Sequence, residues 1–176
     1  MALEIRTLAR ADIPAMAAIY GEAVRTLTAT FETEPPDVAE MTRRFELREA
    51  GGYPGVAAVV DGAVVGYAET RAYHHRAGYP FTVEDSIFLA PQARGQGVGT
   101  ALLAELVERA EARGFRQMIA VIGDAENAGS VALHRRAGFA LVGTTEAVGI
   151  KFGRWIGVTI MQRALGEGSA TLPPGV

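Results

Sequence analysis

The chain has 176 residues, of which 49% are hydrophobic and 21% charged, and its net charge is -3. This length fits one domain with a hydrophobic core, and the composition argues against disorder. The slight negative charge offers no attraction for a phosphate backbone, so we expect no nucleic-acid partner. The absence of cysteine excludes a disulfide, a thiolate nucleophile and a thiolate metal site. Because the sequence also lacks an early apolar run, we expect a cytoplasmic protein without a membrane partner.

The first part of the chain predicts antiparallel strands and two helices. Residues 3–8 alternate apolar and polar side chains, which is typical of a half-buried strand. Asp12 and Asp37 each stand where a helix N-cap is expected, before apolar residues at helical spacing. The pair Asp61-Gly62 is a strong hairpin signal. We therefore expect a strand at 3–8, helices that begin near Asp12 and Asp37, and paired strands at 56–60 and 63–67.

The rest of the chain predicts strands that alternate with helices. Residues 82–89 read as a strand that Pro91 ends, and an apolar stripe from Val98 predicts a helix that Gly114 terminates. Residues 118–122 form a short continuous apolar run, as in a strand buried in parallel pairing. We further expect a helix from Asn127 or Ser130 to Gly138, strands at 139–145 and 156–164, and a single α/β domain at 1–165 followed by a disordered tail at 166–176.

Residues 94–100, with the sequence Arg-Gly-Gln-Gly-Val-Gly-Thr, lie between a predicted strand and a predicted helix. Glycines at alternate positions free the backbone N–H groups to converge on an anion, and the helix N-terminus adds its dipole. The loop lacks the lysine of a P-loop, and Thr100 replaces the last glycine of a dinucleotide fingerprint. The loop therefore predicts a pyrophosphate cradle, and the alternative is a tight turn without a ligand.

Two motifs resemble those of the GNAT superfamily of N-acetyltransferases. Residues 94–99 match its principal motif, Gln/Arg-x-x-Gly-x-Gly/Ala. Residues 127–139 match the motif Asn-x-x-Ser-x-x-Leu-Tyr-x-x-x-Gly-Phe, with His134 in place of the tyrosine. Further segments resemble the phosphinothricin and methionine sulfoximine acetyltransferase branch, and these are residues 30–31, 82–84, 119–123, 133–134, 148–155 and 161–163. The similarity runs from about residue 3 to residue 165.

The resemblance implies a GNAT fold, which is an α/β architecture with a single mixed central sheet of about seven strands flanked by helices. It also implies acetyl-CoA as the co-substrate, no metal, and a homodimer. The residues expected to bind acetyl-CoA are Ile87, Phe88, Leu89, Arg94, Gly95, Gln96, Gly97, Val98, Gly99, Thr100, Asn127 and Ser130. Core packing is the alternative for the side chains of residues 87–89, and helix capping is the alternative for Asn127.

Two residues are candidates for the proton transfers of the reaction. Glu84 lies on the strand before the glycine loop, where Val83, Ile87 and Phe88 would shield it from water. The resemblance gives Glu84 the role of general base, directly or through a water molecule. The resemblance aligns His134 with a tyrosine that often protonates the departing thiolate in the superfamily, and an imidazolium can do the same near neutral pH. The alternatives are a surface carboxylate for Glu84 and a packing or cofactor-binding role for His134.

The substrate implied by the resemblance is a small amino acid, such as phosphinothricin, methionine sulfoximine or methionine sulfone. Arg76 is the first choice for gripping its carboxylate or phosphinate, because a guanidinium presents paired donors in a planar fork. The residues expected to bind the substrate are Phe31, Tyr73, His74, Arg76, Tyr79, Lys151 and Arg154. His75 and Trp155 belong to the same segments.

Two departures from the branch leave the choice of substrate open. His74 stands where an arginine is common, and Gly157 stands where an aspartate is common. One alternative is acetylation of another amine, such as a protein N-terminus or a polyamine, which would favour an acidic pocket. Another is a non-catalytic acyl-CoA-binding regulator, against which the presence of Glu84 argues. The adjacent histidines at 74 and 75 are a weak metal signal, because no spaced third ligand accompanies them.

Overall fold

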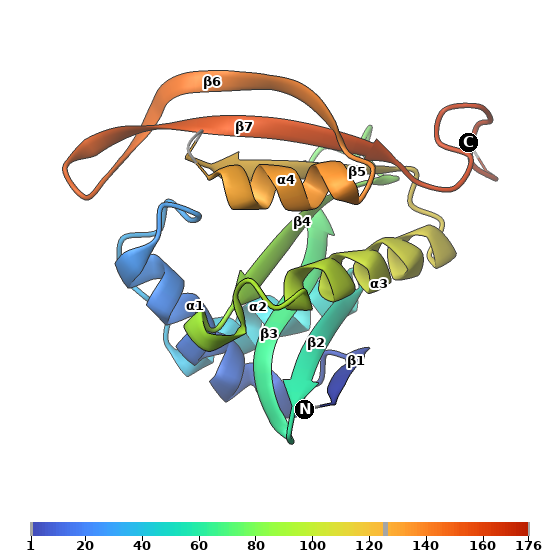
Figure 1. The fold of residues 1–176 in the computed structure, drawn as a ribbon. Helices are drawn as coiled ribbons and strands as arrows, with labels where there is room; N and C mark the ends of the chain where they lie inside the picture. Colours follow the sequence, from blue (N-terminus) through green and yellow to red (C-terminus); the bar gives the residue numbers. More distant parts are fainter. Residues whose placement is uncertain (1, 125–126, 176) are drawn as a thin grey trace.

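One mixed sheet organises the chain, with its seven strands in the order β1-β2-β3-β4-β5-β7-β6 (Figure 1). The computed structural model describes residues 2–124 and 127–175, and the elements below are those of this part of the chain. The strands are β1 (Leu3–Thr7), β2 (Gly55–Val60), β3 (Ala63–Ala72), β4 (Thr82–Leu89), β5 (Gln117–Gly123), β6 (Ala140–Lys151) and β7 (Arg154–Ala164). The helices are α1 (Ile13–Thr26), α2 (Val38–Ala50), α3 (Val98–Ala112) and α4 (Ala128–Arg136), with short 3₁₀ turns at Arg10–Asp12 and Pro91–Ala93. This architecture confirms the predicted fold class.

Helices cover both faces of the sheet. Successive side chains of a strand point to opposite faces, so β2 and β3 present apolar side chains on both. On one face, α3 packs against a cluster that includes Val56, Ala58 and Ala68. On the other face, α1 and α2 pack against a second cluster that includes Ala57 and Tyr67. The central strands β2 and β3 therefore lie between two hydrophobic cores, which fix the position of β4 beside them.

The sheet opens between β4 and β5. These strands are paired in parallel from Thr82 with Gln117 to Asp85 with Ala120. Beyond this point β4 continues its pairing with β3, while β5 continues its pairing with β7. Figure 1 shows the two parts of the sheet diverging, with β1–β4 in one part and β5–β7 in the other. The second half of β4, from Ser86, therefore presents one backbone edge to the opening.

Local signals in the sequence locate most elements correctly. Asp61-Gly62 forms the predicted hairpin turn, and the φ angles of its residues are 49° and 81°, as a type I′ turn requires. Helix α3 starts at Val98, and Gly114 follows it with a φ angle of 84°. Asn127, rather than Ser130, is the N-cap of α4, because its side chain accepts a hydrogen bond of 3.2 Å from the backbone N–H of Ser130.

Two predicted features need correction. Asp12 occupies the N-cap position of α1, but its carboxylate accepts two hydrogen bonds of 2.7 Å from Arg6 and one from the N–H of Ala9. The two late strands are longer than predicted, since β6 continues to Lys151 and β7 begins at Arg154. The reason is that β6 is an edge strand with mostly exposed side chains, so it lacks the alternation of a half-buried strand.

The chain continues after β7 as a series of turns. Leu165 is fully buried, and its N–H donates a hydrogen bond of 3.0 Å to the carbonyl of Arg116. The guanidinium of Arg116 lies 3.4 Å from the carboxylate of Glu167. The division of the chain at residue 165 stays a prediction. None of the helices in the described ranges has the length and apolar composition that crossing a membrane requires.

Candidate active site

The opening between β4 and β5 connects cavities on the two faces of the sheet. A large cavity of about 710 Å³ lies beside α1 and α2. A loop cavity of about 550 Å³ lies beside the glycine loop and α4, and a small cavity of about 70 Å³ lies between the two. The small cavity shares Ser86 and Phe88 with the large cavity, and it shares Ile87, Phe88 and Asn127 with the loop cavity. Molecules bound on opposite faces can therefore meet at the opening.

The loop between β4 and α3 has the backbone geometry of an anion site. Gly95 and Gly97 have φ angles of 73° and 80°, in the left-handed region that favours glycine. Gly97 is also the N-cap of α3, so the unpaired N–H groups and the dipole of this helix lie at the cavity wall. Arg94 adds a positive charge and donates a hydrogen bond of 3.3 Å to the carbonyl of Leu89. This arrangement can hold a pyrophosphate.

The structure brings together nearly all residues predicted to bind acetyl-CoA. Those that line the loop cavity are Ile87, Phe88, Leu89, Arg94, Gly95, Gly97, Gly99, Thr100, Asn127 and Ser130. Two others do not line it: the side chain of Gln96 donates a hydrogen bond to the carbonyl of Gln92, and the side chain of Val98 is buried in the α3 core. The positions of the Gln96 and Val98 side chains therefore do not support direct contact with acetyl-CoA.

Sequence reasoning missed part of the loop cavity. Gly129, Leu133 and Arg136 lie on one face of α4 and line the cavity, as does Thr28 from the loop after α1. Positions 129, 133 and 136 share one face of a helix, and this spacing is the sequence signal that could have identified the three residues. Arg136 is important because it supplies a second guanidinium to the cavity that holds Arg94. Thr28 comes from a distant part of the chain, and no local pattern indicates it.

His134 and Asp85 form a buried pair at the small cavity. The Nε2 atom of His134 lies 3.0 Å from Oδ2 of Asp85, and its Nδ1 atom lies 2.8 Å from the carbonyl oxygen of Ser130. Burial acts to lower the pKa of His134, but the hydrogen bond and the charge of Asp85, with the carbonyl of Ser130, outweigh it and raise the pKa above the ordinary value of 6.5. The pair therefore favours an imidazolium, which can donate a proton.

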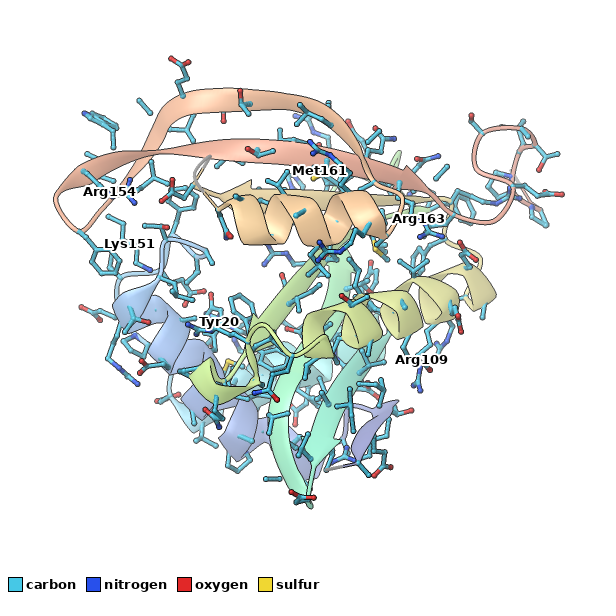
Figure 2. The ribbon with its side chains drawn as sticks, viewed as in Figure 1. Tyr20, Arg109, Lys151, Arg154, Met161 and Arg163 are labelled. Carbon is cyan, nitrogen blue, oxygen red and sulfur yellow. The ribbon has the colours of Figure 1, made fainter. Side chains whose placement is uncertain are left out.

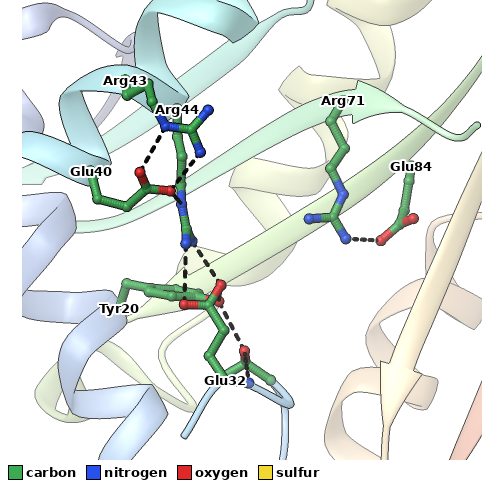
Figure 3. A network of polar contacts seen from close by, with 8 residues as sticks. Tyr20, Glu32, Glu40, Arg43, Arg44, Arg71 and Glu84 are labelled. Atoms are coloured by element: carbon green, nitrogen blue, oxygen red, sulfur yellow. Dashed lines mark hydrogen bonds and ion pairs between the residues drawn. The ribbon is translucent and has the colours of Figure 1, made fainter. Parts of the chain in front are cut away.

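Glu84 lies on the opposite face of β4 and lines the large cavity. Its side chain is 14% exposed and accepts a hydrogen bond from Nη2 of Arg71 on β3 (Figure 3). Of the neighbours expected to shield Glu84, Val83 and Ile87 point instead into the α3 core. Only Phe88 of the three contributes to the same cavity. Residues that line the large cavity therefore shield Glu84 from water, and Phe88 is the one expected neighbour among them.

The charges that line the large cavity are balanced. Three arginines and three glutamates contribute, namely Arg44, Arg48, Arg71, Glu32, Glu69 and Glu84. Figure 3 shows Arg44 between Glu32 and Glu40, with distances of 2.8 Å and 2.7 Å. These hydrogen bonds outweigh burial and raise the pKa of Arg44. A cavity of this kind suits a ligand that itself carries both charges.

The remaining buried pair at the large cavity joins α2 to β3. Arg48 is almost fully buried, and it lies 3.4 Å from Glu69 and 2.9 Å from Glu49. It also donates a hydrogen bond of 3.2 Å to the carbonyl of Tyr53. Burial raises the pKa of Glu69, although Arg48, Arg71 and Arg44 act in the opposite direction. Neither Glu69 nor Arg48 was singled out from the sequence, because no local motif marks them.

Most residues expected to bind the substrate lie away from the large cavity, and Phe31 is the exception that lines it. Tyr79 packs against Tyr73 and His74 in the exposed loop between β3 and β4, with ring centroids 5.8 Å and 5.1 Å apart. The backbone N–H of Arg76 donates to Nδ1 of His74 at 3.1 Å in the same loop. Substrate contact by this loop stays a prediction.

Lys151 and Arg154 lie at the end of the β6–β7 hairpin, beside the loop that follows α1 (Figure 2). The ammonium of Lys151 donates hydrogen bonds of 2.7 Å and 2.8 Å to the carbonyls of Leu27 and Thr30. Burial lowers the pKa of Lys151, while Glu32 acts to raise it. Arg154 pairs with Asp124 at 2.6 Å. Lys151 therefore holds the loop directly, and Arg154 acts on it through Asp124, whose carboxylate also accepts a hydrogen bond of 2.8 Å from Thr28. Direct substrate contact by Lys151 and Arg154 stays a prediction.

A metal site finds no support among the residues that the structure describes. His74 and His75, the weak metal signal of the sequence, stack with ring centroids 4.3 Å apart. Within the described ranges, no group of three potential ligands from histidine, aspartate or glutamate is close enough together to hold an ion.

Comparison with known proteins identifies the family. A model of the acetyltransferase (GNAT) family matches residues 16–139. The chain is 46% identical over 172 residues to the phosphinothricin N-acetyltransferase of Alcaligenes faecalis, which covers 98% of this chain and 87% of that protein. It is 42% identical over 163 residues to the L-methionine sulfoximine/L-methionine sulfone acetyltransferase of Pseudomonas aeruginosa, with 92% and 94% covered.

The fold gives the same result. The crystal structure of a GNAT superfamily phosphinothricin acetyltransferase from Sinorhizobium meliloti, in complex with acetyl-CoA, matches with a TM-score of 0.96 and 51% identity. The match covers 100% of this chain and 96% of that one. Family model, sequence relatives and fold agree, so this chain belongs to the GNAT family and is an N-acetyltransferase.

Proposed function

We propose that this enzyme transfers the acetyl group of acetyl-CoA to the α-amine of a small amino acid, such as phosphinothricin, methionine sulfoximine or methionine sulfone. The observation that carries the proposal is the connection between the loop cavity and the cavity that holds Glu84, through the opening between β4 and β5. The names of the relatives from Alcaligenes faecalis and Pseudomonas aeruginosa favour the same substrates.

Acetyl-CoA occupies the loop cavity in this proposal. Its pyrophosphate lies on the N–H groups of the glycine loop and the start of α3, beside Arg94 and Arg136. Its pantetheine arm lies along residues 86–89 of β4, where the backbone edge no longer pairs with β5. A main-chain N–H of this edge can then polarise the thioester carbonyl. This places the acetyl group at the small cavity.

Glu84 acts as the general base from the large cavity. It accepts a proton from the substrate ammonium, directly or through a water molecule, and the neutral amine attacks the thioester carbonyl. A nitrogen–carbon bond forms, the second proton of the amine leaves the nitrogen to water, and the carbon–sulfur bond breaks, so the leaving group is a thiolate. Two observations support this role: Glu84 lines the large cavity, and the neighbouring Ser86 and Phe88 line both that cavity and the small one.

His134 supplies the proton that the thiolate needs. Its ring lines the small cavity from α4, opposite the face of β4 that carries Glu84. Burial acts to lower the pKa of His134, but Asp85 and the Ser130 carbonyl outweigh it and raise the pKa, which favours the charged ring that can donate a proton. Base and acid therefore come from opposite faces of one strand, which separates the proton taken from the amine from the proton given to sulfur.

The lining of the large cavity favours a zwitterionic amino acid over a polyamine. A polyamine would need an excess of carboxylates, whereas the arginines at 44, 48 and 71 balance the glutamates at 32, 69 and 84. Arg76, Lys151 and Arg154, which the sequence predicts at the substrate, do not line this cavity, so its positive charge comes from other arginines. A non-catalytic regulator is disfavoured by the position of Glu84.

We also propose that the enzyme works in the cytoplasm as a homodimer. The lack of cysteine fits a reducing compartment. The edge strand β6, the hairpin turn and the start of β7 expose large apolar side chains, which are Leu141, Val142, Val148, Ile150, Phe152 and Trp155. Each of them is more than half exposed, and such a patch on a sheet edge is typical of an interface.

The proposed function is tested by following thiol release from acetyl-CoA with a panel of amines. The panel contains phosphinothricin, methionine sulfoximine, methionine sulfone, common amino acids, a polyamine and a peptide with a free N-terminus. We expect turnover with the first three to exceed turnover with the polyamine and the peptide. Preference for the polyamine or the peptide would favour the alternative amine, and no thiol release with any amine would favour the regulator.

A further inference from the structure

Arg71 is the most exposed of the three arginines that line the large cavity. Arg44 is held by Glu32 and Glu40, and Arg48 is buried against other groups of the protein. Arg71 differs because its side chain is 67% exposed, and within the described residues its one ion-pair partner is Glu84. A guanidinium in this state can turn its remaining donors toward a ligand.

Arg71 is held at the proposed base by the sheet itself. Arg71 of β3 and Glu84 of β4 are directly opposite in the antiparallel register, so their side chains lie on the same face of the sheet. Both line the large cavity, whereas Arg76 in the exposed loop does not. An amino acid whose amine approaches Glu84 therefore brings its α-carboxylate, two bonds from the nitrogen, close to Arg71.

The pairing of Arg71 with Glu84 opposes the chemistry assigned to Glu84. The hydrogen bond from Nη2 of Arg71 occupies Oε1 of Glu84, so this oxygen is not available to accept a proton from the substrate. In the enzyme without substrate, one oxygen of the base is therefore blocked by Arg71. A second anion that binds Arg71 would remove this restraint.

We propose, on the basis of the proposed function, that the substrate α-carboxylate takes the place of Glu84 on Arg71. The exchange forms a carboxylate–guanidinium pair between substrate and Arg71 and breaks the pair between Arg71 and Glu84. The released Glu84 then takes one proton from the adjacent substrate ammonium, which leaves a neutral amine and a protonated Glu84. Arg71 thereby selects amino acids over simple amines and couples their binding to activation of the base.

The other charges around Arg71 are compatible with an incoming carboxylate. Glu69 lies on the same face of β3 as Arg71. Burial raises the pKa of Glu69, so its negative charge is less favoured than that of an exposed glutamate. Arg48 lies 3.4 Å from Glu69 and offsets the charge that remains. Glu32 is compensated by Arg44 at 2.8 Å. The attraction on an incoming carboxylate therefore comes mainly from the positive charge of Arg71.

The test compares methionine sulfone with 3-(methylsulfonyl)propan-1-amine, which is the same molecule without the carboxylate. Values of kcat/KM are measured for both amines with the wild type and with Arg71→Gln. A matched control is Arg10→Gln, because Arg10 is 64% exposed and pairs with Glu46 away from the cavities. Arg71→Lys retains the charge but not the planar fork, and acetyl-CoA binding is followed in every variant.

We expect the wild type and Arg10→Gln to prefer methionine sulfone by about 10- to 100-fold, the range of a hydrogen bond to a charged group. Arg71→Gln should lose most of this preference, and its turnover of the simple amine should rise because Glu84 is released. Arg71→Lys should be intermediate. A preference that is the same in Arg71→Gln and the wild type overturns the assignment of Arg71 alone. No turnover of any amino acid by the wild type overturns the proposed function, and this inference with it.

Discussion

The Nε2 atom of His134 lies 3.0 Å from the carboxylate of Asp85, with both side chains at most 5% exposed. The second oxygen of Asp85 is buried and has no hydrogen-bond partner among the described residues. The two residues are 49 positions apart in sequence and meet at the small cavity, where the proposed reaction takes place. A buried histidine bound in this way couples the protonation of the site to the stability of the fold.

The first prediction concerns the pH dependence of stability. The pKa of His134 is raised on folding, so its pairing with Asp85 contributes stability fully below about pH 6.5 and loses it as pH rises through the folded value. Asp85→Asn removes the charge but keeps the shape. The thermal midpoint of the wild type minus that of Asp85→Asn should therefore shrink from about pH 5 to about pH 9.

The control for this comparison is Asp61→Asn, because Asp61 lies in the exposed β2–β3 turn far from His134. Its difference from the wild type should not follow the same curve. A wild-type advantage over Asp85→Asn that stays constant across this pH range would show that His134 and Asp85 do not share a proton-linked interaction.

The second prediction isolates the anion site of the glycine loop. Gly97 and Gly62 have nearly equal φ angles of 80° and 81°, and neither has another atom within 4 Å of the position of an added Cβ. Alanine at either position should cost about 1–2 kcal/mol of folding free energy through left-handed strain. The KM for acetyl-CoA should rise several-fold in Gly97→Ala only. An equal KM in the two variants would place the pyrophosphate elsewhere.

The third prediction concerns Lys151, which is the single lysine of the chain. Its ammonium donates to the carbonyls of Leu27 and Thr30, and residues 27–30 form part of the walls of the large and loop cavities. Lys151→Met should lower the free energy of unfolding by about 1–3 kcal/mol, because the two carbonyls lose their donor. The KM values for both substrates should also rise. Unchanged stability in chemical unfolding would contradict this role.

The fourth prediction concerns the exposed edge of β6. Ile150 is 58% exposed and lies opposite Trp155 in the hairpin. Ile150→Lys should shift the protein from dimer to monomer in sedimentation, because a charge in an apolar interface remains unpaired. Val38→Lys is the control, since Val38 is similarly exposed at the start of α2, away from this edge. A wild type that sediments as a monomer would remove the proposed homodimer.

Sequence reasoning located the elements whose signals are local. The glycine loop, the turn at Asp61-Gly62 and the cap at Asn127 each depend on a few adjacent residues, and the structure has them at the predicted places. The loop cavity is formed mainly by such segments, so most of the expected acetyl-CoA residues line it. The extent of β6 was missed because an exposed edge strand has no buried face to give it a period.

The large cavity was harder to predict because its charged residues come from separate elements. Arg71 faces Glu84 through the pairing of β3 with β4, and Arg44 reaches Glu32 from a helix. Lys151 was expected at the substrate because its segment resembles one that borders the substrate pocket in the related branch, whereas its partners lie more than 120 residues earlier in the sequence. Local patterns carry no information on such pairings, which depend on the register of the sheet and the packing of the helices.

The most direct test of the account measures turnover of methionine sulfone by the wild type and by Glu84→Gln at saturating acetyl-CoA. The wild type should release one thiol for each amine acetylated. Glu84→Gln should bind acetyl-CoA normally but turn over about 100-fold more slowly or worse, since general base catalysis is lost. Glu46→Gln, an exposed substitution on α2, should match the wild type. Equal turnover by Glu84→Gln and the wild type at neutral pH would contradict the account.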